Sequence, residues 1–172
     1  MQPAVDLLAT PAFSPPTWPL VTPDLLMGYV GAVMVVRIGG ALSGHDLARY
    51  FVEWKRGVDA RPPGASVFAM YDIFEWPGMN AVQRREWAGM LKSREEILRQ
   101  TTRGMVLASS STLTRGAARA IFWLAPPPYP YSVVPTPRAA FEAIAQRGGP
   151  PASATLAAYD AFVKKHWRGT TK

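Results

Sequence analysis

Residues 66–74, SVFAMYDIF, are a short apolar run bounded by turn residues, and they decide the fold predicted for the whole chain. A run of this length predicts a buried strand, with Asp72 near its carboxyl end. Residues 104–109, GMVLAS, predict a second buried strand, and residues 25–38 predict two strands or one bent strand that ends at Gly39-Gly40. Buried strands without alternation are typical of a parallel sheet that is covered on both faces.

Helical segments separate these strands. An S-x-x-D spacing from Ser43 and an Asn80–Gln83 pair both predict capped helix starts, and Thr136 followed by Pro137 predicts another. The helices are expected over residues 43–58, 80–100, 115–124, 136–147 and 153–167, with a further strand at 131–134. In the third helix Ala118, Ile121 and Phe122 are expected to face inward. The predicted fold class is therefore α/β, with a mostly parallel central sheet of four to five strands and helices packed on it.

The length of 172 residues suits one domain with short appendages. Residues 1–23 contain six prolines and predict an N-terminal Pro-rich arm, which Phe13, Trp18 and Leu20 could attach to the body. The α/β domain is expected over residues 24–147. Residues 148–172 are expected to form a linker and a C-terminal helix that ends in basic residues.

Composition excludes several classes of function. The chain has no cysteine, which excludes disulfides, thiolate catalysis and Cys-based metal sites. His45 and His166 are the only histidines, and neither has a partner at metal-ligand spacing. We therefore predict no enzyme, no metal and no cofactor. No apolar run reaches the roughly 18 residues of a membrane span, and the N-terminus lacks the pattern of a secretory signal. A cytoplasmic location is expected.

The formal net charge of +7 suits an acidic protein surface, anionic lipid or nucleic acid. The basic residues are spread along the chain, and no nucleic-acid-binding motif accompanies them. Charge alone does not choose among these partners.

The first candidate site follows the buried strand at 66–74. Ligands of open α/β sheets commonly bind at the carboxyl ends of strands. The acidic and aromatic residues that end this strand, and the start of the following helix, therefore form a candidate ligand site. Its candidate residues are Asp72, Glu75, Trp76, Asn80 and Arg84. The interpretation that we favour is a structural one, in which an acid of the loop caps the following helix.

The second candidate site follows the strand at 104–109. Ser110, Ser111, Thr112 and Arg115 place hydroxyls and a guanidinium at a predicted helix start, a combination that suits phosphate or carboxylate. Ordinary helix capping is again the favoured interpretation. Residues 126–129, PPPY, have the form that WW domains recognise, but a rigid connector is the stronger interpretation.

From Gly39 to about Arg147 the pattern resembles the STAS family, which occurs in sulfate transporters and anti-sigma-factor antagonists. The resemblance rests on GGALSGHDLARYFVEW, the strand VFAMYDIF, the strand GMVLASS and the helix TRGAARAIFWL. It implies a non-catalytic regulatory module that binds a protein partner. In phosphorylated antagonists a Ser or Thr follows the strand-end Asp, whereas residues 73–80 here contain no hydroxyl side chain. No phosphosite is carried over.

The leading hypothesis is therefore a protein-interaction module. A binder of a small anionic ligand or lipid is the alternative, and a nucleic-acid or acidic-surface binder is the third. The sequence leaves open whether the chain forms a homodimer.

Overall fold

The computed structural model describes residues 19–62, 64–78, 80–124 and 126–169. Its six strands form one sheet in sequence order. The first two pairings are antiparallel and the remaining three are parallel. The strands are β1 (Leu20–Val21), β2 (Leu25–Val30), β3 (Val33–Ile38), β4 (Val67–Ile73), β5 (Thr102–Ala108) and β6 (Tyr131–Val134). The predicted α/β class is confirmed.

The sheet has more strands than the four to five expected, because Leu20 and Val21 pair with β2. These two residues lie within the segment predicted as an arm. The earlier part of that segment, with Phe13 and Trp18, lies outside the described residues.

The stretch at 25–38 forms a hairpin. Val30 and Val33 are register partners, so Gly31 and Ala32 make a two-residue connection. Gly31 has a φ of 57°. Two-residue hairpin turns need a positive φ at their first central residue, and glycine adopts it without steric cost. The turn therefore fixes the register of β2 on β3.

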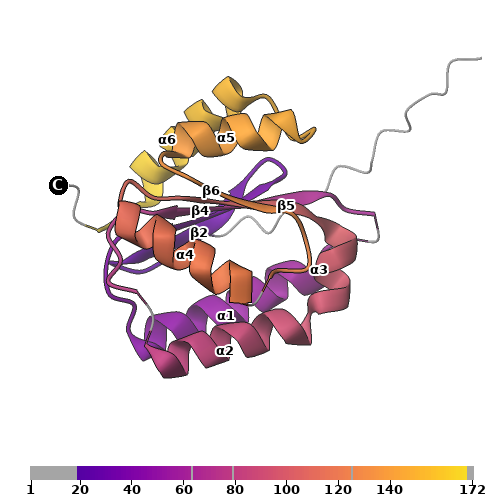
Figure 1. The fold of residues 1–172 in the computed structure, drawn as a ribbon. Coiled ribbons are helices and arrows are strands. Elements are labelled where there is room, and N and C mark those ends of the chain that lie inside the picture. The colour runs from indigo at the N-terminus through magenta and orange to yellow at the C-terminus, as the bar shows by residue number, and fades with distance from the viewer. Residues whose placement is uncertain (1–18, 63, 79, 125, 170–172) are drawn as a thin grey trace, which may run out of the picture.

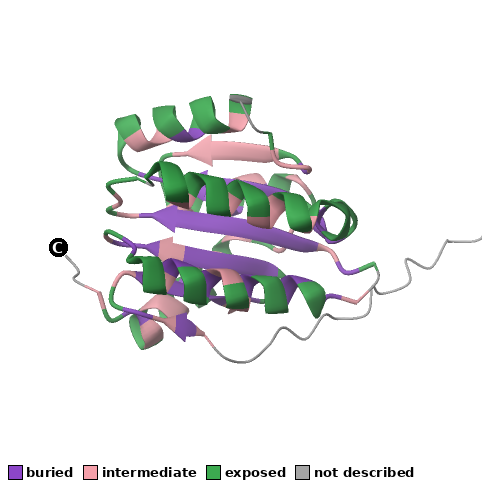
Figure 2. Ribbon diagram, turned by 90° about the horizontal axis from the view of Figure 1, so that it is seen from below, coloured by how far each residue is buried: buried purple, intermediate pink, exposed green. Residues whose placement is uncertain are grey.

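Helices cover both faces of the sheet (Figure 1). One face carries α1 (Gly44–Asp59), α2 (Ala81–Ser93), α3 (Glu95–Thr101) and α4 (Thr112–Leu124). The other carries α5 (Pro137–Gln146) and α6 (Ala152–His166). Figure 2 shows the strands buried beneath the first layer, except β6 at the sheet edge, whose residues are half-buried.

Alternate residues of the strands supply a core on each side of the sheet. Met34 and Val36 of β3 point toward α1, and Val33 and Val35 point toward α5 and α6. Both sets are buried. This explains why the strand sequences are apolar throughout, since a strand covered on both faces has no wet side.

An aromatic cluster joins α1, α2 and the sheet. The Tyr50 and Tyr71 hydroxyls lie 2.9 Å apart in a hydrogen bond, and Trp87 stacks on Tyr50 with ring centroids 5.3 Å apart. Burial raises the pKa of Tyr71 to about 12. Trp54 is buried beside this cluster, as its helical register predicts.

Helix caps follow the sequence signals. Ser43 accepts a hydrogen bond from the Asp46 amide, and Thr136 accepts one from the Ala139 amide. The predicted helix at 80–100 is wrong in one respect, because it breaks into α2 and α3 at Arg94. Arg94 has φ −126° and ψ 14° and donates two hydrogen bonds to Asp59 of α1. A long-range ion pair therefore accompanies the break.

Candidate functional site

The carboxyl ends of the parallel strands meet at one edge of the sheet, and both candidate stretches begin there. Asp72 of β4 is the register partner of Ala108 of β5. The loop at 74–80 follows β4, and Ser109 to Ser111 follow β5. We call the surface formed by Glu75, Trp76 and the first turn of α2 the β4–α2 surface.

Asp72 does not belong to that surface. Its side chain is buried on the opposite side of β4, where Arg37 of β3 and the Tyr159 hydroxyl of α6 each donate a hydrogen bond to it at 2.5 Å. The interpretation of Asp72 as a helix cap is wrong, because Asn80 caps α2. Asp72 instead forms an ion pair with Arg37 and accepts a hydrogen bond from Tyr159, which connects α6 to the sheet.

Burial controls the ionisation of this pair. Loss of hydration raises the pKa of Asp72, and the attraction of Arg37 does not fully offset it. Burial opposes the charge of Arg37 as well, but the attraction of Asp72 leaves the net pKa of Arg37 raised. The side chains of Arg37 and Asp72 are 13% and 6% exposed, so the pair is largely shielded from water.

Aromatic rings enclose the Arg37 guanidinium. Its central carbon lies 5.0 Å from the centroid of the Phe74 ring and 5.2 Å from that of Trp167. The sequence pattern did not predict Arg37 and Tyr159 as partners of Asp72, or Trp167 as a neighbour of Arg37. Only the parallel register of β3 on β4, which makes Arg37 the neighbour of Asp72, could have suggested the first of them.

The remaining residues of the first candidate site do lie at the surface. Glu75, Asn80 and Arg84 are exposed, and Trp76 is half-buried against the core beneath α1 and α2. Asn80 and Gln83 form a reciprocal capping box. Asn80 therefore has a structural role, Glu75 is exposed on the loop, and Trp76 packs partly against the core.

The second candidate site uses its polar groups locally. Ser111 accepts a hydrogen bond from the Thr114 amide at 3.1 Å and so caps α4. Arg115 donates to the carbonyls of Ser109 and Ser110 at 2.7 and 2.8 Å, and to the Thr112 hydroxyl at 3.1 Å. The Arg115 guanidinium thus binds groups of its own loop. The N–H groups that make these hydrogen bonds are not available to an anion.

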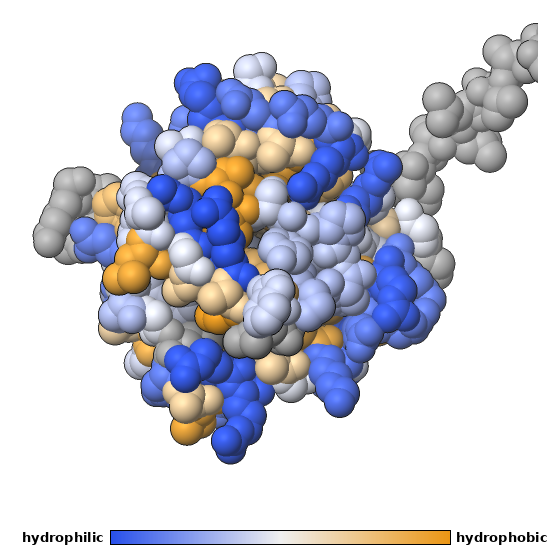
Figure 3. Space-filling view, in the orientation of Figure 1, coloured by the Kyte–Doolittle hydropathy of each residue, from blue (hydrophilic) through white to orange (hydrophobic). Residues whose placement is uncertain are grey.

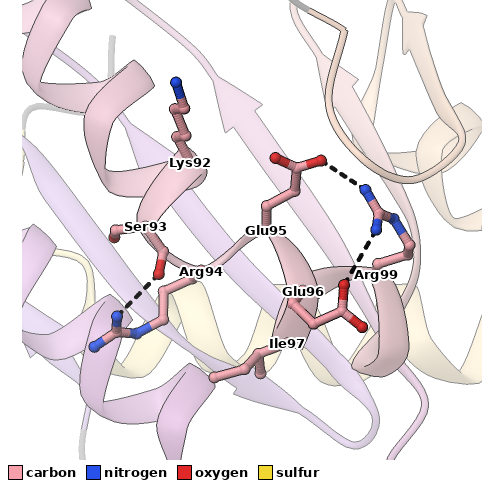
Figure 4. A pocket seen from close by; sticks show the side chains of 7 residues that line it. All are labelled: Lys92, Ser93, Arg94, Glu95, Glu96, Ile97 and Arg99. Atoms are coloured by element: carbon pink, nitrogen blue, oxygen red, sulfur yellow. Dashed lines mark hydrogen bonds and ion pairs between the residues drawn. The ribbon is translucent and has the colours of Figure 1, made fainter.

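A shallow depression of about 530 Å³ lies at the junction of α2 and α3 (Figure 4). Charged residues line it, and four of them form ion pairs with one another or with α1. Arg99 bridges Glu95 and Glu96, and Arg94 binds Asp59. The depression therefore offers a solvated surface instead of a set of groups that converge on a ligand.

The PPPY stretch has a structural explanation. Tyr129 of the PPPY stretch is 8% exposed and packs in the core, so a WW domain could not reach it in the folded chain.

Within the described ranges, no three His, Cys, Asp or Glu side chains are grouped to hold a metal ion. No helix of the described chain is long and apolar enough to cross a membrane.

Comparison with known proteins bears on the fold. No family model matches the sequence, and no curated protein matches it. A solved structure from Shewanella loihica PV-4, an uncharacterized protein of the DUF3478 family with a SpoIIAA-like fold, is similar with a TM-score of 0.53. The two chains are 12% identical, and the match covers 69% of this chain and 90% of the other. This chain therefore has a SpoIIAA-like fold, the STAS-like architecture that its sequence pattern resembles.

Proposed function

We propose that the protein is a non-catalytic regulatory module that binds a protein partner through the β4–α2 surface. The STAS-like fold is in general a regulatory fold. A fold alone does not define a function, so the proposal needs a feature of this surface.

The observation that carries the proposal is the weak burial of α2. None of its described side chains is fully buried, although the helix lies over the sheet. Val82 in its first turn is 63% exposed and lies close in sequence to the half-buried Trp76. Aromatic residues and arginine are enriched at protein interfaces, and this surface combines Trp76 and the exposed Val82 with Arg84 and Arg85.

The buried ion pair supports a non-catalytic function. Burial raises the pKa of Asp72, and acids with a raised pKa often mark catalytic sites. Here both of its hydrogen-bonding neighbours belong to the contact between α6 and the sheet. The raised pKa of Asp72 is therefore explained by its structural role in holding α6 on the sheet.

The test is capture of partners from an extract of the source cell on immobilised protein. The variant Glu75→Arg/Val82→Glu changes two exposed residues of the surface. The matched control, Glu142→Arg/Val52→Glu, makes the same changes on α5 and α1, and Val52 is exposed to the same 63% as Val82.

A protein enriched on the wild type and on the control, and lost from the surface variant, is the expected result. Binding that the surface variant retains in full would show that this surface is the wrong one. Equal circular dichroism spectra of the variants would establish that each is folded.

A further inference from the structure

Trp167, the residue that follows α6, is seated at the carboxyl end of β3. Its side chain is buried, and its amide donates a hydrogen bond to the Val163 carbonyl at 2.8 Å. A Cβ added at Gly39 would lie 2.5 Å from the indole ring, so a side chain at this position would displace the ring. Gly39, which the sequence pattern identifies as the end of a strand, therefore also makes room for Trp167.

Ring contacts hold Trp167 in this seat. The central carbon of the Arg37 guanidinium lies 5.2 Å from the centroid of the Trp167 ring, and a cation–π contact is stronger where water is excluded. The indole N–H is buried and has no hydrogen-bond partner among the described residues. In Figure 3 the layer of α5 and α6, at the top, presents mainly blue and pale residues, whereas Tyr159 and Trp167 are buried. The large aromatic residues of this segment are thus directed to the sheet.

The same guanidinium contacts the loop that follows β4. The Phe74 ring lies 5.0 Å from the central carbon of Arg37, and the Phe74 amide donates a hydrogen bond to the Ile38 carbonyl at 2.8 Å. Two residues later, Trp76 packs partly against the core beneath α1 and α2, on the opposite face of the sheet. A chain of contacts therefore leads from Trp167 through Arg37 and Phe74 to the loop of the β4–α2 surface.

We propose that Trp167 is a positioning residue for the β4–α2 surface. Its ring keeps Arg37 against Phe74, and Phe74 fixes the start of the loop that carries Glu75 and Trp76. The role in binding rests on the proposed function, whereas the ordering of the loop is a property of the chain alone. A loop that is already ordered binds a partner at a lower entropic cost. Release of Trp167 therefore weakens binding on the opposite face of the sheet without changing any residue of that surface.

Hydrogen exchange of the full chain, measured by mass spectrometry, tests the ordering of the loop. Trp167→Ala removes the ring, whereas Gly39→Ala keeps the ring and fills its seat with a methyl group. Each variant should raise the exchange rate of the amides of residues 74–78 by about tenfold and leave β5 as protected as in the wild type. Trp123→Ala is the control, because Trp123 on α4 is 80% exposed, and it should change neither rate.

Three results would overturn the ordering role. Unchanged exchange of residues 74–78 in either variant would show that the seat of Trp167 does not order the loop. An equal rise in β5 would show a general loss of stability instead of a local one. Trp167→Phe keeps an aromatic ring beside Arg37 and should restore most of the protection, so exchange as fast as in Trp167→Ala would also contradict the proposal.

The affinity for a captured partner tests the role in binding. The Kd of Trp167→Ala should be about tenfold higher than that of the wild type, because the loop must then be ordered on binding. An equal Kd would overturn the positioning role and leave the proposed function intact. A partner retained by Glu75→Arg/Val82→Glu would instead refute the proposed function, while the exchange rates would still decide whether Trp167 orders the loop.

Discussion

The ion pair between Arg37 and Asp72 predicts a specific and pH-dependent loss of stability in Arg37→Met. Methionine keeps the aliphatic stem of the side chain but is shorter than arginine, so it removes the guanidinium, its charge and its contacts with the Phe74 and Trp167 rings. Asp72 would then remain buried, with Tyr159 as its hydrogen-bond donor but no counter-charge. The variant therefore measures the loss of the whole guanidinium, with its charge and its ring contacts.

The expected loss of unfolding free energy in Arg37→Met depends on how deeply the ion pair is buried. Breaking a buried ion pair by removing one partner costs about 3–5 kcal/mol. Because the Arg37 side chain is 13% exposed, we expect the lower end, about 3 kcal/mol at neutral pH. That loss corresponds to a fall in Tm of roughly 6–12 °C for a domain of this size.

The dependence on pH has a defined sign. Burial raises the pKa of Asp72 above 3.8, so the folded state binds the proton more tightly than the unfolded chain. The contribution of this carboxyl to stability is therefore complete below its ordinary pKa and is lost as the pH rises through the folded value. Removing Arg37 raises that pKa further. The deficit of Arg37→Met should be largest at neutral pH and should shrink as the pH falls.

Urea denaturation followed by tryptophan fluorescence measures these differences. Arg99→Met is the matched control, because Arg99 is 56% exposed in its pair with Glu95 and should lose no more than about 1 kcal/mol. The double variant Arg37→Met/Asp72→Asn should recover part of the loss, since it removes the buried charge as well. Equal losses in Arg37→Met and Arg99→Met, or a deficit independent of pH, would refute the reasoning.

Three further predictions follow from local geometry. Asn80→Ala should reduce the free energy of unfolding by about 1 kcal/mol, since it removes the acceptor that caps α2; an unchanged urea midpoint would mean that the cap contributes nothing. Gly28→Ala should cost about 1–3 kcal/mol, because a Cβ there would lie 2.5 Å from the Phe162 ring, and Gly28→Ala/Phe162→Leu should regain stability. A WW domain should bind a peptide that contains the PPPY stretch but not the native protein, as calorimetry can establish, because Tyr129 is buried.

Much of the fold could be predicted from the sequence because its signals are local. The apolar run ending near Asp72 predicts a strand without reference to the rest of the chain, and the caps at Ser43, Asn80 and Thr136 depend on residues three positions away. The break at Arg94 could not be predicted in this way. It involves Asp59, which lies 35 residues earlier on another helix.

The candidate site was harder to predict because side-chain direction depends on tertiary structure. Asp72 was located correctly at a strand end, but its partners lie 35 and 87 residues away. The inward direction of α4 is confirmed for Ala118, which is buried, and for Phe122, which packs against the core, but it is wrong for Ile121, which is 45% exposed. Helical periodicity identifies the centre of the inward face, whereas the exposure of a residue at the edge of that face depends on the neighbouring elements.

The two faces of the sheet differ in a way that bears on function. On one face α6 is attached by the Arg37–Asp72–Tyr159 hydrogen bonds, and Gly28 leaves only enough space for Phe162. A helix held in this way contributes stability, and its displacement would expose a buried charge. On the opposite face α2 buries none of its described side chains fully, and α4 leaves Leu113 and Trp123 exposed. Because association needs accessible apolar surface at low cost to the fold, partners are expected on the α2 and α4 side.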